Sequence, residues 1–302
     1  MTGAASYVGS INLDLTMRVS AFPEPGETVA ATELAESSGG KSANQACASA
    51  RLGAAASLVA GVGNDAAGRQ LLDDAARAGV DVSGCVTIAD EPTGRAFIER
   101  DATGENRIVI VAGANGALRP HHVSPEQFVG NDVACFALEV PLDTVRSGLA
   151  AAKRHDAITV LNPSPFTAEV VELLAWTDIL VLNVHEAQQL ATLLDCDMNE
   201  LVAQQRVSAV VVTAGGSGAT IHEGSRTQMV PAFAVNVRDT TGCGDAFTGA
   251  VASELAAGSS LKQAVEQGTA VGAFAAERLG AQPSYPTRAE LDDWLTTARR
   301  NS

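Results

Sequence analysis

The stretch Asp239-Thr-Thr-Gly-Cys-Gly-Asp-Ala-Phe247 does most to decide the fold of this chain. It follows the apolar run Phe233–Val237, which predicts a strand, and it precedes Ala246–Ala257, whose small residues predict a helix. A glycine-rich turn that opens a helix points several backbone N–H groups at one spot, with the positive end of the helix dipole behind them. The segment is therefore suited to bind an anion.

An aspartate within such a turn is unfavourable unless it takes a proton from a molecule that binds there. Asp245 lies in the turn beside Gly242 and Gly244, so these residues indicate phosphoryl chemistry with a built-in base. The alternative interpretation is an ordinary strand-to-helix turn in which Asp245 only caps the helix. The segment alone favours neither interpretation.

The composition is typical of a soluble globular protein and argues against several partners. The 302 residues are 46% hydrophobic with a mean hydropathy of +0.11, and no run approaches the roughly 18 apolar residues of a membrane span. The net charge of −15 argues against nucleic acid or an anionic membrane as a partner. Five scattered cysteines without a CxxC pair indicate neither disulfides nor a zinc site. The amino-terminal MTGAASYVGS lacks the features of a signal peptide, so we expect a cytoplasmic protein.

Apolar strand-like runs alternate with helical patterns along most of the chain. The expected strands are Ser6–Ile11, Ser57–Ala60, Val133–Leu138, Ile158–Leu161, Ile179–Leu182 and Ala209–Thr213. The expected helices include Ala43–Leu52, Ala66–Ala78, Leu142–Arg154, His185–Leu194 and, near the end of the chain, Arg288–Ala298. Apolar strands that alternate with helices predict a parallel sheet covered on both faces.

Two segments break this alternation. Asp14–Ser38 alternates apolar and polar residues without a helix, and Thr93–Ala112 predicts a hairpin of Ala96–Arg100 and Arg107–Val111 joined by Asp101–Glu105. We interpret these four strands as a small second layer that acts as a lid. The expected division is an α/β core of residues 1–13, 39–92 and 113–302 and a lid of residues 14–38 and 93–112.

Two glycine-rich motifs imitate nucleotide-binding signatures. Ala35-Glu-Ser-Ser-Gly-Gly-Lys-Ser42 fits a permissive P-loop pattern, but the residues before it are polar and acidic, so no buried strand is expected to lead into the loop. Gly61-Val-Gly-Asn-Asp-Ala66 imitates a dinucleotide fingerprint, but Asp65 would repel a pyrophosphate. We interpret neither motif as a nucleotide site.

The loop Gly39-Gly-Lys-Ser-Ala-Asn-Gln45 suits a neutral polyol. Glycines allow close backbone approach, and the Asn44 amide both donates and accepts hydrogen bonds. Asn12 and Asp14 follow the first strand two residues apart, so they lie on one side of an extended segment. Without other observations the alternative, turn-forming Asn and Asp with surface glycines, is slightly favoured.

Seven segments match one protein family in order and spacing. They are Val8-Gly-Ser-Ile-Asn-Leu-Asp14, Pro25-Gly-Glu-Thr28, Gly39-Gly-Lys-Ser-Ala-Asn-Gln-Ala46, Ala112-Gly-Ala-Asn115, Asn183-Val-His-Glu186, Asp239–Phe247 and Gly280-Ala-Gln-Pro-Ser284. Together they resemble the ribokinase-like (PfkB) family of carbohydrate kinases, and the resemblance covers about residues 6–295. It implies a three-layer α/β/α fold with a mostly parallel central sheet and a small β-sheet lid.

The resemblance implies that the opening segment transfers a phosphoryl group. Asp245 matches the family's catalytic base, which would deprotonate a primary hydroxyl of the sugar for in-line attack on the γ-phosphate of ATP. The backbone N–H groups of Gly242, Cys243 and Gly244 match the anion hole that stabilises charge on the transferring group.

The resemblance also implies three sets of binding residues. The sugar set is Asn12, Asp14, Gly40, Lys41, Asn44, Glu139 and Asp245. The set for ATP and Mg²⁺ is Asn183, Glu186, Thr213, Gly215, Gly218 and Gly244. The set for an activating monovalent cation, usually K⁺, is Asp239, Thr241, Ala275, Arg278, Gly280 and Ser284. Lid strands pair between subunits in the family, so a homodimer is also implied.

Three residues depart from the family's pattern. Ser42 replaces a glycine of the sugar loop, Val140 replaces a serine after Glu139, and Cys243 fills a position usually held by alanine. None of these changes removes a catalytic group. Ser42 adds a hydroxyl near the expected sugar, so it bears on which sugar is bound.

The resemblance therefore implies an ATP- and Mg²⁺-dependent, K⁺-activated kinase that makes D-ribose 5-phosphate from D-ribose. The alternatives are a related kinase for a nucleoside such as uridine, for deoxyribose or for a ketose. From a different class, the alternative is a non-catalytic sugar sensor on the same fold. The hydroxyl-reading side chains match the ribose-specific pattern, and the intact Asp245 disfavours the sensor.

Overall fold

The computed structural model describes residues 3–102 and 105–298, and within them the main sheet has eight strands. These are β1 (Ala4–Val8), β4 (Ala55–Val59), β9 (Val133–Ala137), β10 (Ile158–Asn162), β11 (Ile179–Asn183), β12 (Ala209–Thr213), β13 (Ala219–Glu223) and β14 (Arg226–Val230). Their order across the sheet is β14-β13-β12-β11-β10-β9-β1-β4. All neighbours pair in parallel except β12 with β13 and β13 with β14. The predicted, mostly parallel sheet is confirmed.

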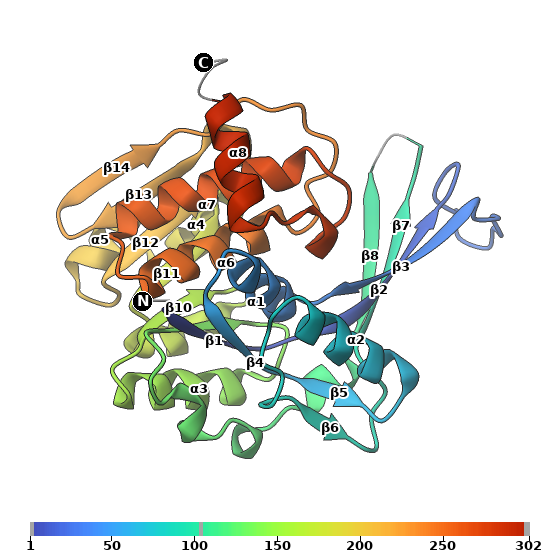
Figure 1. Ribbon diagram of the computed structural model, residues 1–302, viewed down its shortest axis with the longest axis horizontal. Coiled ribbons are helices and arrows are strands. Elements are labelled where there is room, and N and C mark those ends of the chain that lie inside the picture. Colours follow the sequence, from blue (N-terminus) through green and yellow to red (C-terminus); the bar gives the residue numbers. More distant parts are fainter. Residues whose placement is uncertain (1–2, 103–104, 299–302) are drawn as a thin grey trace.

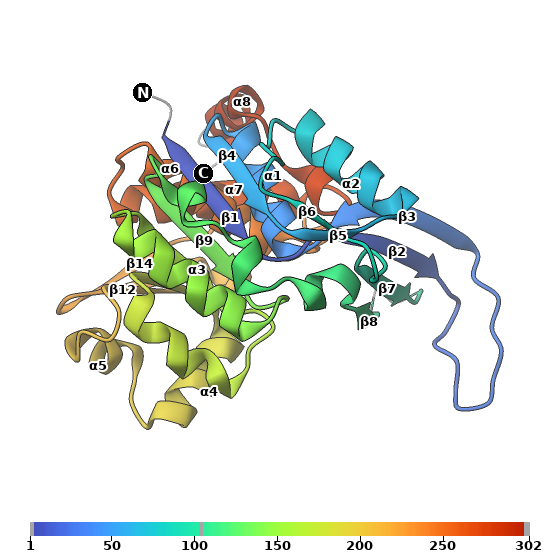
Figure 2. The same cartoon turned by 90° about the horizontal axis from the view of Figure 1, so that it is seen from below.

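Helices cover both faces of this sheet (Figures 1 and 2). On one face lie α1 (Lys41–Arg51), α6 (Cys243–Ala256) and α7 (Leu261–Ala276), and on the other lie α3 (Leu142–Arg154), α4 (Val184–Leu194) and α5 (Met198–Ala203). Two further helices, α2 (Ala66–Arg77) and α8 (Arg288–Ala298), complete the fold. No helix in the described ranges has the length and hydropathy that crossing a membrane would require.

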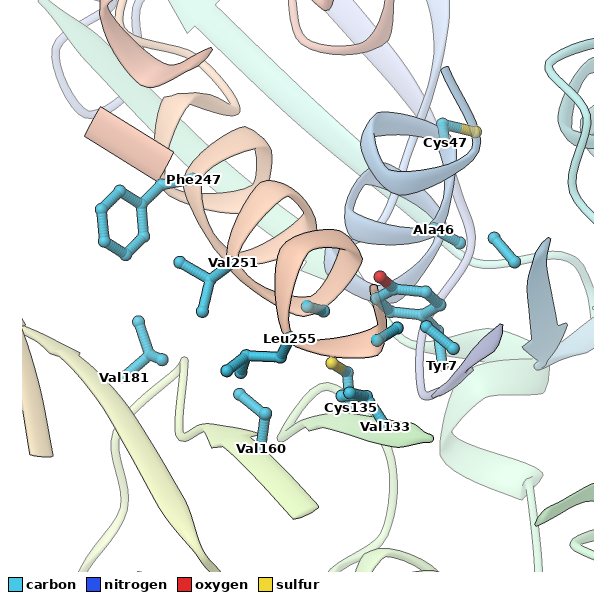
Figure 3. Packing of buried hydrophobic residues seen from close by; sticks show 14 of the residues in the cluster. Tyr7, Ala46, Cys47, Val133, Cys135, Val160, Val181, Phe247, Val251 and Leu255 are labelled. Carbon is cyan, nitrogen blue, oxygen red and sulfur yellow. The ribbon is translucent and has the colours of Figure 1, made fainter. Parts of the chain in front are cut away.

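Alternation along the strands sends side chains into two cores. In β9, Val133 and Cys135 join the core under α1 and α6, while Ala134 and Phe136 join the core under α3. Figure 3 shows the first core, in which Phe247, Val251 and Leu255, four residues apart along α6, point toward the strands. The apolar face of α6 thereby fixes the depth and rotation of the helix that carries the opening segment.

The second layer is a four-stranded sheet in the order β3-β2-β7-β8, which projects from one end of the molecule (Figures 1 and 2). Its strands are β2 (Asn12–Arg18), β3 (Glu33–Gly39), β7 (Arg95–Arg100) and β8 (Asn106–Val111). They begin and end slightly beyond the predicted limits, since Asn12 pairs with Gly39. Of the predicted turn Asp101–Glu105, residues 103–104 lie outside the described residues.

The structure shows how two segments singled out in the sequence, residues 233–237 and 61–66, are folded. The predicted strand Phe233–Val237 was wrong: this stretch pairs with no strand, and the following helix begins at Cys243 rather than Ala246. The segment Gly61–Ala66, which imitates a dinucleotide fingerprint, forms a short strand and the start of α2. Gly61–Gly63 is the short strand β5, paired with β6 (Val86–Ile88), and the Asp65 carboxylate caps α2 by accepting from the Gly68 N–H at 2.8 Å.

Candidate active site

The polar residues of the site lie where the parallel strands end. Glu139 follows β9, Asn162 and Asn183 are the last residues of β10 and β11, and Thr213 is the last residue of β12. The carboxyl ends of parallel strands meet at one edge of a sheet, which is where α/β folds bind their ligands. Residues from across the sequence are therefore brought to a common edge.

Asp245 lies in the first turn of α6, and its side chain is 8% exposed. It does not cap the helix, because the capping residue is Gly242 and no side-chain cap is formed. Its oxygens instead accept hydrogen bonds from α1: Asn44 Nδ2 donates to Oδ2 at 3.0 Å and Gln45 Nε2 donates to Oδ1 at 3.3 Å. The helix-capping alternative is thereby ruled out.

Close packing of α1 on α6 makes these contacts possible. Gly249 lies one turn beyond Asp245, and a Cβ there would come within 2.3 Å of the Gln45 carbonyl oxygen. Any larger residue would push the two helices apart and withdraw the amides from the carboxylate.

The electrostatics of the site keep Asp245 suited to accept a proton. Burial raises the pKa of Asp245, while the Lys41 ammonium and the amides of Asn44 and Gln45 lower it; the net change is upward. A carboxylate with a raised pKa is a stronger base than one in water, and the amide donors offset part of the cost of its ionisation.

The sugar-binding set of the sequence analysis gathers around Lys41. The Lys41 backbone N–H donates to Glu139 Oε2 at 3.2 Å, and the Ser10 hydroxyl donates to the same oxygen. Burial, with the charges of Glu139 and Asp245, raises the pKa of Asp14 to about 7. Burial alone would lower the pKa of Lys41, but the surrounding carboxylates, Asp245 foremost, raise it. The cluster is thus a set of donors and acceptors in which the charged side chains of Asp14, Lys41 and Glu139 are half-buried.

Asn12 and Ser42 are held by the backbone or by a neighbouring amide. Asn115 Nδ2 donates to Asn12 Oδ1 at 2.7 Å and to the Ile11 carbonyl at 3.1 Å. The Ser42 hydroxyl, fully buried, donates to the Val8 carbonyl at 3.1 Å. Because Ser42 is bonded to a backbone oxygen of β1, its extra hydroxyl already has a partner within the protein.

An apolar pocket of about 220 Å³ lies beside the amino-terminal end of α6. The predicted nucleotide residues Thr213, Gly215, Gly218 and Gly244 all line it. The remaining lining residues are Gly216, Ala232, Phe233, Val235, Val237, Thr240, Cys243, Phe247, Thr269, Gly272, Ala273 and Ala276. The stretch predicted as a strand thus lines this pocket instead of joining the sheet.

Asn183 and Glu186 are joined to each other at the start of α4. Asn183 Oδ1 accepts from the Glu186 N–H and Glu186 Oε2 accepts from the Asn183 N–H, each at 2.9 Å, which is a reciprocal capping box. Glu186 also contributes to the raised pKa of Lys41. The two residues therefore fix each other's side chains at the start of α4.

Asp239 organises the turn before α6 and the loop after α7. Its Oδ1 accepts from the Thr241 N–H at 3.0 Å and from the Thr241 hydroxyl at 2.7 Å, and its Oδ2 accepts from the Gly280 N–H at 3.0 Å. Arg100, the last residue of β7, lies 3.5 Å from Oδ2. Burial raises the pKa of Asp239, but these hydrogen bonds and the Arg100 charge outweigh it and lower the pKa overall.

The rest of the predicted cation set lies close by. Ala275 is near the end of α7, its carbonyl accepts from the Arg278 N–H at 2.9 Å, and the Ser284 hydroxyl donates to the Ala281 carbonyl at 2.6 Å. The structure thus brings Asp239, Thr241 and Gly280 into direct contact, while Ala275 lies in the last turn of α7 and Arg278 and Ser284 follow that helix. Within the described chain, no cluster of three or more His, Cys, Asp or Glu side chains could hold a metal.

One of the three backbone N–H groups predicted to form the anion hole already donates a hydrogen bond within the protein. The Cys243 N–H donates to the Thr240 carbonyl at 3.2 Å, within the turn itself. Burial, with the charges of Asp239 and Asp245, raises the pKa of the Cys243 thiol to about 11, which makes it a poor nucleophile near neutral pH.

The sequence analysis missed several residues of the site. Asn162 and Gln282 each bond to an amide that touches Asp245, and Arg100 pairs with Asp239. Asn162 could have been found, since a polar residue at the carboxyl end of an apolar strand is a signal of a ligand edge. Gln282 lies within the recognised segment 280–284, but no local feature indicated its contact with Asn44, and Arg100 lies in no recognised segment.

Comparisons with known proteins agree with this geometry. The pfkB family carbohydrate kinase profile matches residues 4–288. A ribokinase of Haemophilus influenzae is 33% identical over 306 residues, covering 99% of this chain and 100% of its own length. The crystal structure of ribokinase from Thermotoga maritima superimposes with a TM-score of 0.90 at 33% identity, covering 97% of this chain and 99% of that one. Ribokinase of Arabidopsis thaliana complexed with ribose and ATP gives a TM-score of 0.87 at 26% identity, with 98% and 99% coverage.

Proposed function

The chain belongs to the pfkB family of carbohydrate kinases, and from this we propose that it transfers the γ-phosphate of ATP to the 5-hydroxyl of D-ribose, giving D-ribose 5-phosphate. One observation supports this most directly. The Asp245 carboxylate touches the hydroxyl-reading amide of Asn44, while its neighbour Gly244 lines the apolar pocket. A base between a polyol site and a nucleotide pocket is the arrangement that sugar phosphorylation needs.

In the proposed reaction the sugar hydroxyl gives its proton to Asp245, and the hydroxyl oxygen forms a bond to the γ-phosphorus of ATP. The bond from the γ-phosphorus to the bridging oxygen breaks, and ADP leaves with that electron pair. The amino-terminal end of α6, with Gly242 and Gly244, would stabilise the charge on the transferring group. Lys41 would contribute its positive charge on the sugar side.

D-ribose is the substrate that these groups suit best. Asn12, Asp14, Asn44 and Glu139 provide both donors and acceptors for several hydroxyl groups in a small buried cluster. The Ser42 hydroxyl bonds to the Val8 carbonyl, so this departure from the family's pattern does not alter the set of hydroxyl readers. Uridine, deoxyribose and ketoses are less well supported.

The residues fit a monovalent cation by their chemistry. Asp239 is buried with a lowered pKa and so stays ionised, and the neighbouring carbonyls come from the carboxyl end of α7, the negative end of its dipole. We propose that K⁺ is held by Asp239, Thr241, Gly280 and Ser284 together with the backbone carbonyls of Ala275 and Arg278. Bound K⁺ would neutralise charge and order the loop beside the anion-binding turn.

Mg²⁺ would be held mainly by the ATP phosphates, with the Glu186 carboxylate and Asn183 nearby, often through water. Such an ion would neutralise phosphate charge. Asn183 and Glu186 already fix each other at the start of α4, so the pair offers a rigid point of attachment.

The small sheet supports a proposed lid and homodimer. Its edge strand β8 exposes Ile108, Val109, Ile110 and Val111, each between 44% and 65%, and Leu34 of the other edge strand is 62% exposed. Exposed apolar edge strands are normally covered by another chain. We propose that two copies pair through these strands and that the sheet covers the bound sugar. We place the enzyme in the cytoplasm, where ATP is available.

Val109→Asp should therefore convert a dimer into a monomer in sedimentation velocity runs. A buried carboxylate at a subunit interface is strongly unfavourable. Leu193→Asp, an exposed apolar residue on α4, is the matched control and should sediment like the unchanged protein. A monomeric unchanged protein would contradict the proposed dimer.

The proposed substrate is tested by a panel of ribose, deoxyribose, fructose and uridine with ATP and Mg²⁺, in K⁺ or in tetramethylammonium. We expect kcat/KM for ribose to exceed the others by about tenfold or more, since each unpaired polar group in the site costs on the order of 1–3 kcal/mol. We expect K⁺ to raise kcat. Comparable turnover of uridine would contradict the proposal that ribose is the substrate. Equal rates in both salts would contradict the proposed activation by K⁺.

A further inference from the structure

Two chains of amide side chains converge on the Asp245 carboxylate. Gln45 Nε2, which donates to Asp245 Oδ1 at 3.3 Å, also donates to Asn162 Oδ1 at 3.2 Å. Asn44, which donates to Asp245 Oδ2, accepts in turn from Gln282 Nε2 at 3.0 Å. Each oxygen of the carboxylate is thus held by an amide that has a second amide behind it.

The backbone of the central sheet sets the orientation of the first chain. Asn162 Nδ2 donates to the Val181 carbonyl of β11 at 3.0 Å. A carbonyl can only accept, so the Asn162 amide must turn its oxygen toward Gln45, and Gln45 must then turn its NH₂ toward both Asn162 and Asp245. The order of donors and acceptors therefore follows from one fixed backbone group.

Gln45 occupies a position that is costly for folding. Its side chain is fully buried, and its Oε1 has no hydrogen-bond partner within residues 3–102 and 105–298. A buried acceptor without a partner is rare in folded proteins, and here it belongs to the same amide whose nitrogen contacts the Asp245 carboxylate. An apolar residue would avoid this unmatched oxygen, but it would also remove the donor to Asp245.

We propose that Gln45 and Asn162 are positioning residues for the phosphoryl transfer: Asn162, anchored on β11, orients the Gln45 amide, which fixes the Asp245 carboxylate with its remaining lone pairs free for the sugar hydroxyl. The proposal rests on the proposed function of Asp245 as the base. It assigns a role to Asn162, which reaches the base only through Gln45.

The charges around Asp245 explain why neutral donors are used. Lys41 of α1 stabilises the carboxylate, whereas Glu139 after β9 opposes ionisation. The charge of Asp245 also raises the pKa of Asp14 of β2. Tyr285 and Cys243 lie near enough for Asp245 to raise their pKa values, so they remain neutral. An amide stabilises the anion without adding another titrating group.

The test uses the full chain with Gln45→Met and, separately, Asn162→Leu, which keep the approximate volume and remove the donors. Both variants should lower kcat by about 10- to 100-fold with KM for ribose nearly unchanged, because a misplaced base slows the chemical step more than binding. The acidic limb of the profile of kcat/KM against pH should move to higher pH. Gln127→Met, at the opposite edge of the sheet, is the matched control and should leave both unchanged.

A second measurement does not depend on activity. Asp245 is titrated by carboxyl ¹³C NMR, and its signal is assigned by its loss in Asp245→Asn. The pKa of Asp245 should be higher in Gln45→Met and in Asn162→Leu than in the unchanged protein. If Gln45→Met does not fold, Asn162→Leu carries the test, because it leaves α1 and Asp245 untouched.

The outcomes separate this inference from the proposed function. An unchanged titration of Asp245 together with unchanged kcat in the variants would overturn the positioning role alone. Full activity of Asp245→Asn would overturn the proposed function itself.

Discussion

Replacing Asp245 by asparagine is expected to lower kcat with ribose by about 10²–10⁴-fold. Asparagine cannot accept the hydroxyl proton at neutral pH. Its own NH₂ group would also face one of the NH₂ groups of Asn44 and Gln45, which now donate to the carboxylate. ADP formation in a coupled assay measures the loss, and calorimetry measures the binding of ribose, which we expect to persist.

Asp73→Asn on the exposed face of α2 is the matched control and should retain full activity. The same experiment separates the kinase from the sensor. A protein that binds ribose but consumes no ATP even with Asp245 intact would be a sensor. Retention of more than about a tenth of the activity by Asp245→Asn would show that another group is the base.

Gly242→Ala is expected to abolish most of the activity and to lower the melting temperature. Gly242 has φ of +71°, and an added Cβ would come within 2.5 Å of the Tyr285 hydroxyl and 2.6 Å of Ala281 Cβ. The left-handed backbone alone costs a non-glycine residue about 1–3 kcal/mol. Tyr285 also donates to the Gly242 carbonyl at 3.1 Å, so the turn that presents the anion-binding N–H groups would be displaced.

Gly244→Ala provides the comparison within the same turn. An added Cβ at Gly244 meets no atom within 4 Å, so thermal unfolding should be unchanged. Any loss of kcat/KM for ATP in this variant must then arise from the approach of the nucleotide. Equal melting temperatures and equal activities for Gly242→Ala and the unchanged protein would contradict the role of the turn.

The large elements of the fold could be predicted because they depend on local patterns. The apolar runs at 133–138 and 209–213 became central strands, since residues buried on both faces leave a continuous apolar signal. Phe233–Val237 carries the same signal for a different reason. Its apolar side chains line the pocket beside the amino-terminal end of α6, and periodicity alone does not distinguish a sheet partner from a pocket wall.

The candidate site was predictable only as far as its motifs reach. Asp245, Lys41 and Asn44 lie in recognisable segments, and the structure brings them together. The contacts of Arg100 and Gln282 gave no local signal, although Gln282 lies in the recognised segment 280–284, because their partners lie far away in the sequence: Gln282 is 238 residues from Asn44. Such contacts depend on how the layers pack.

The sequence by itself determined the α/β architecture and the glycine-rich turn that opens a helix at Asp239–Phe247, because glycine positions and apolar periodicity act within a few residues. Only the tertiary structure decided whether Asp245 caps its helix or faces a second one. Because α1 packs against α6 at Gly249, the amides of Asn44 and Gln45 reach Asp245, although they lie 201 and 200 positions from it in the chain. A buried carboxylate without hydrogen bonds is strongly unfavourable, so Asp245 faces the helix that supplies these donors.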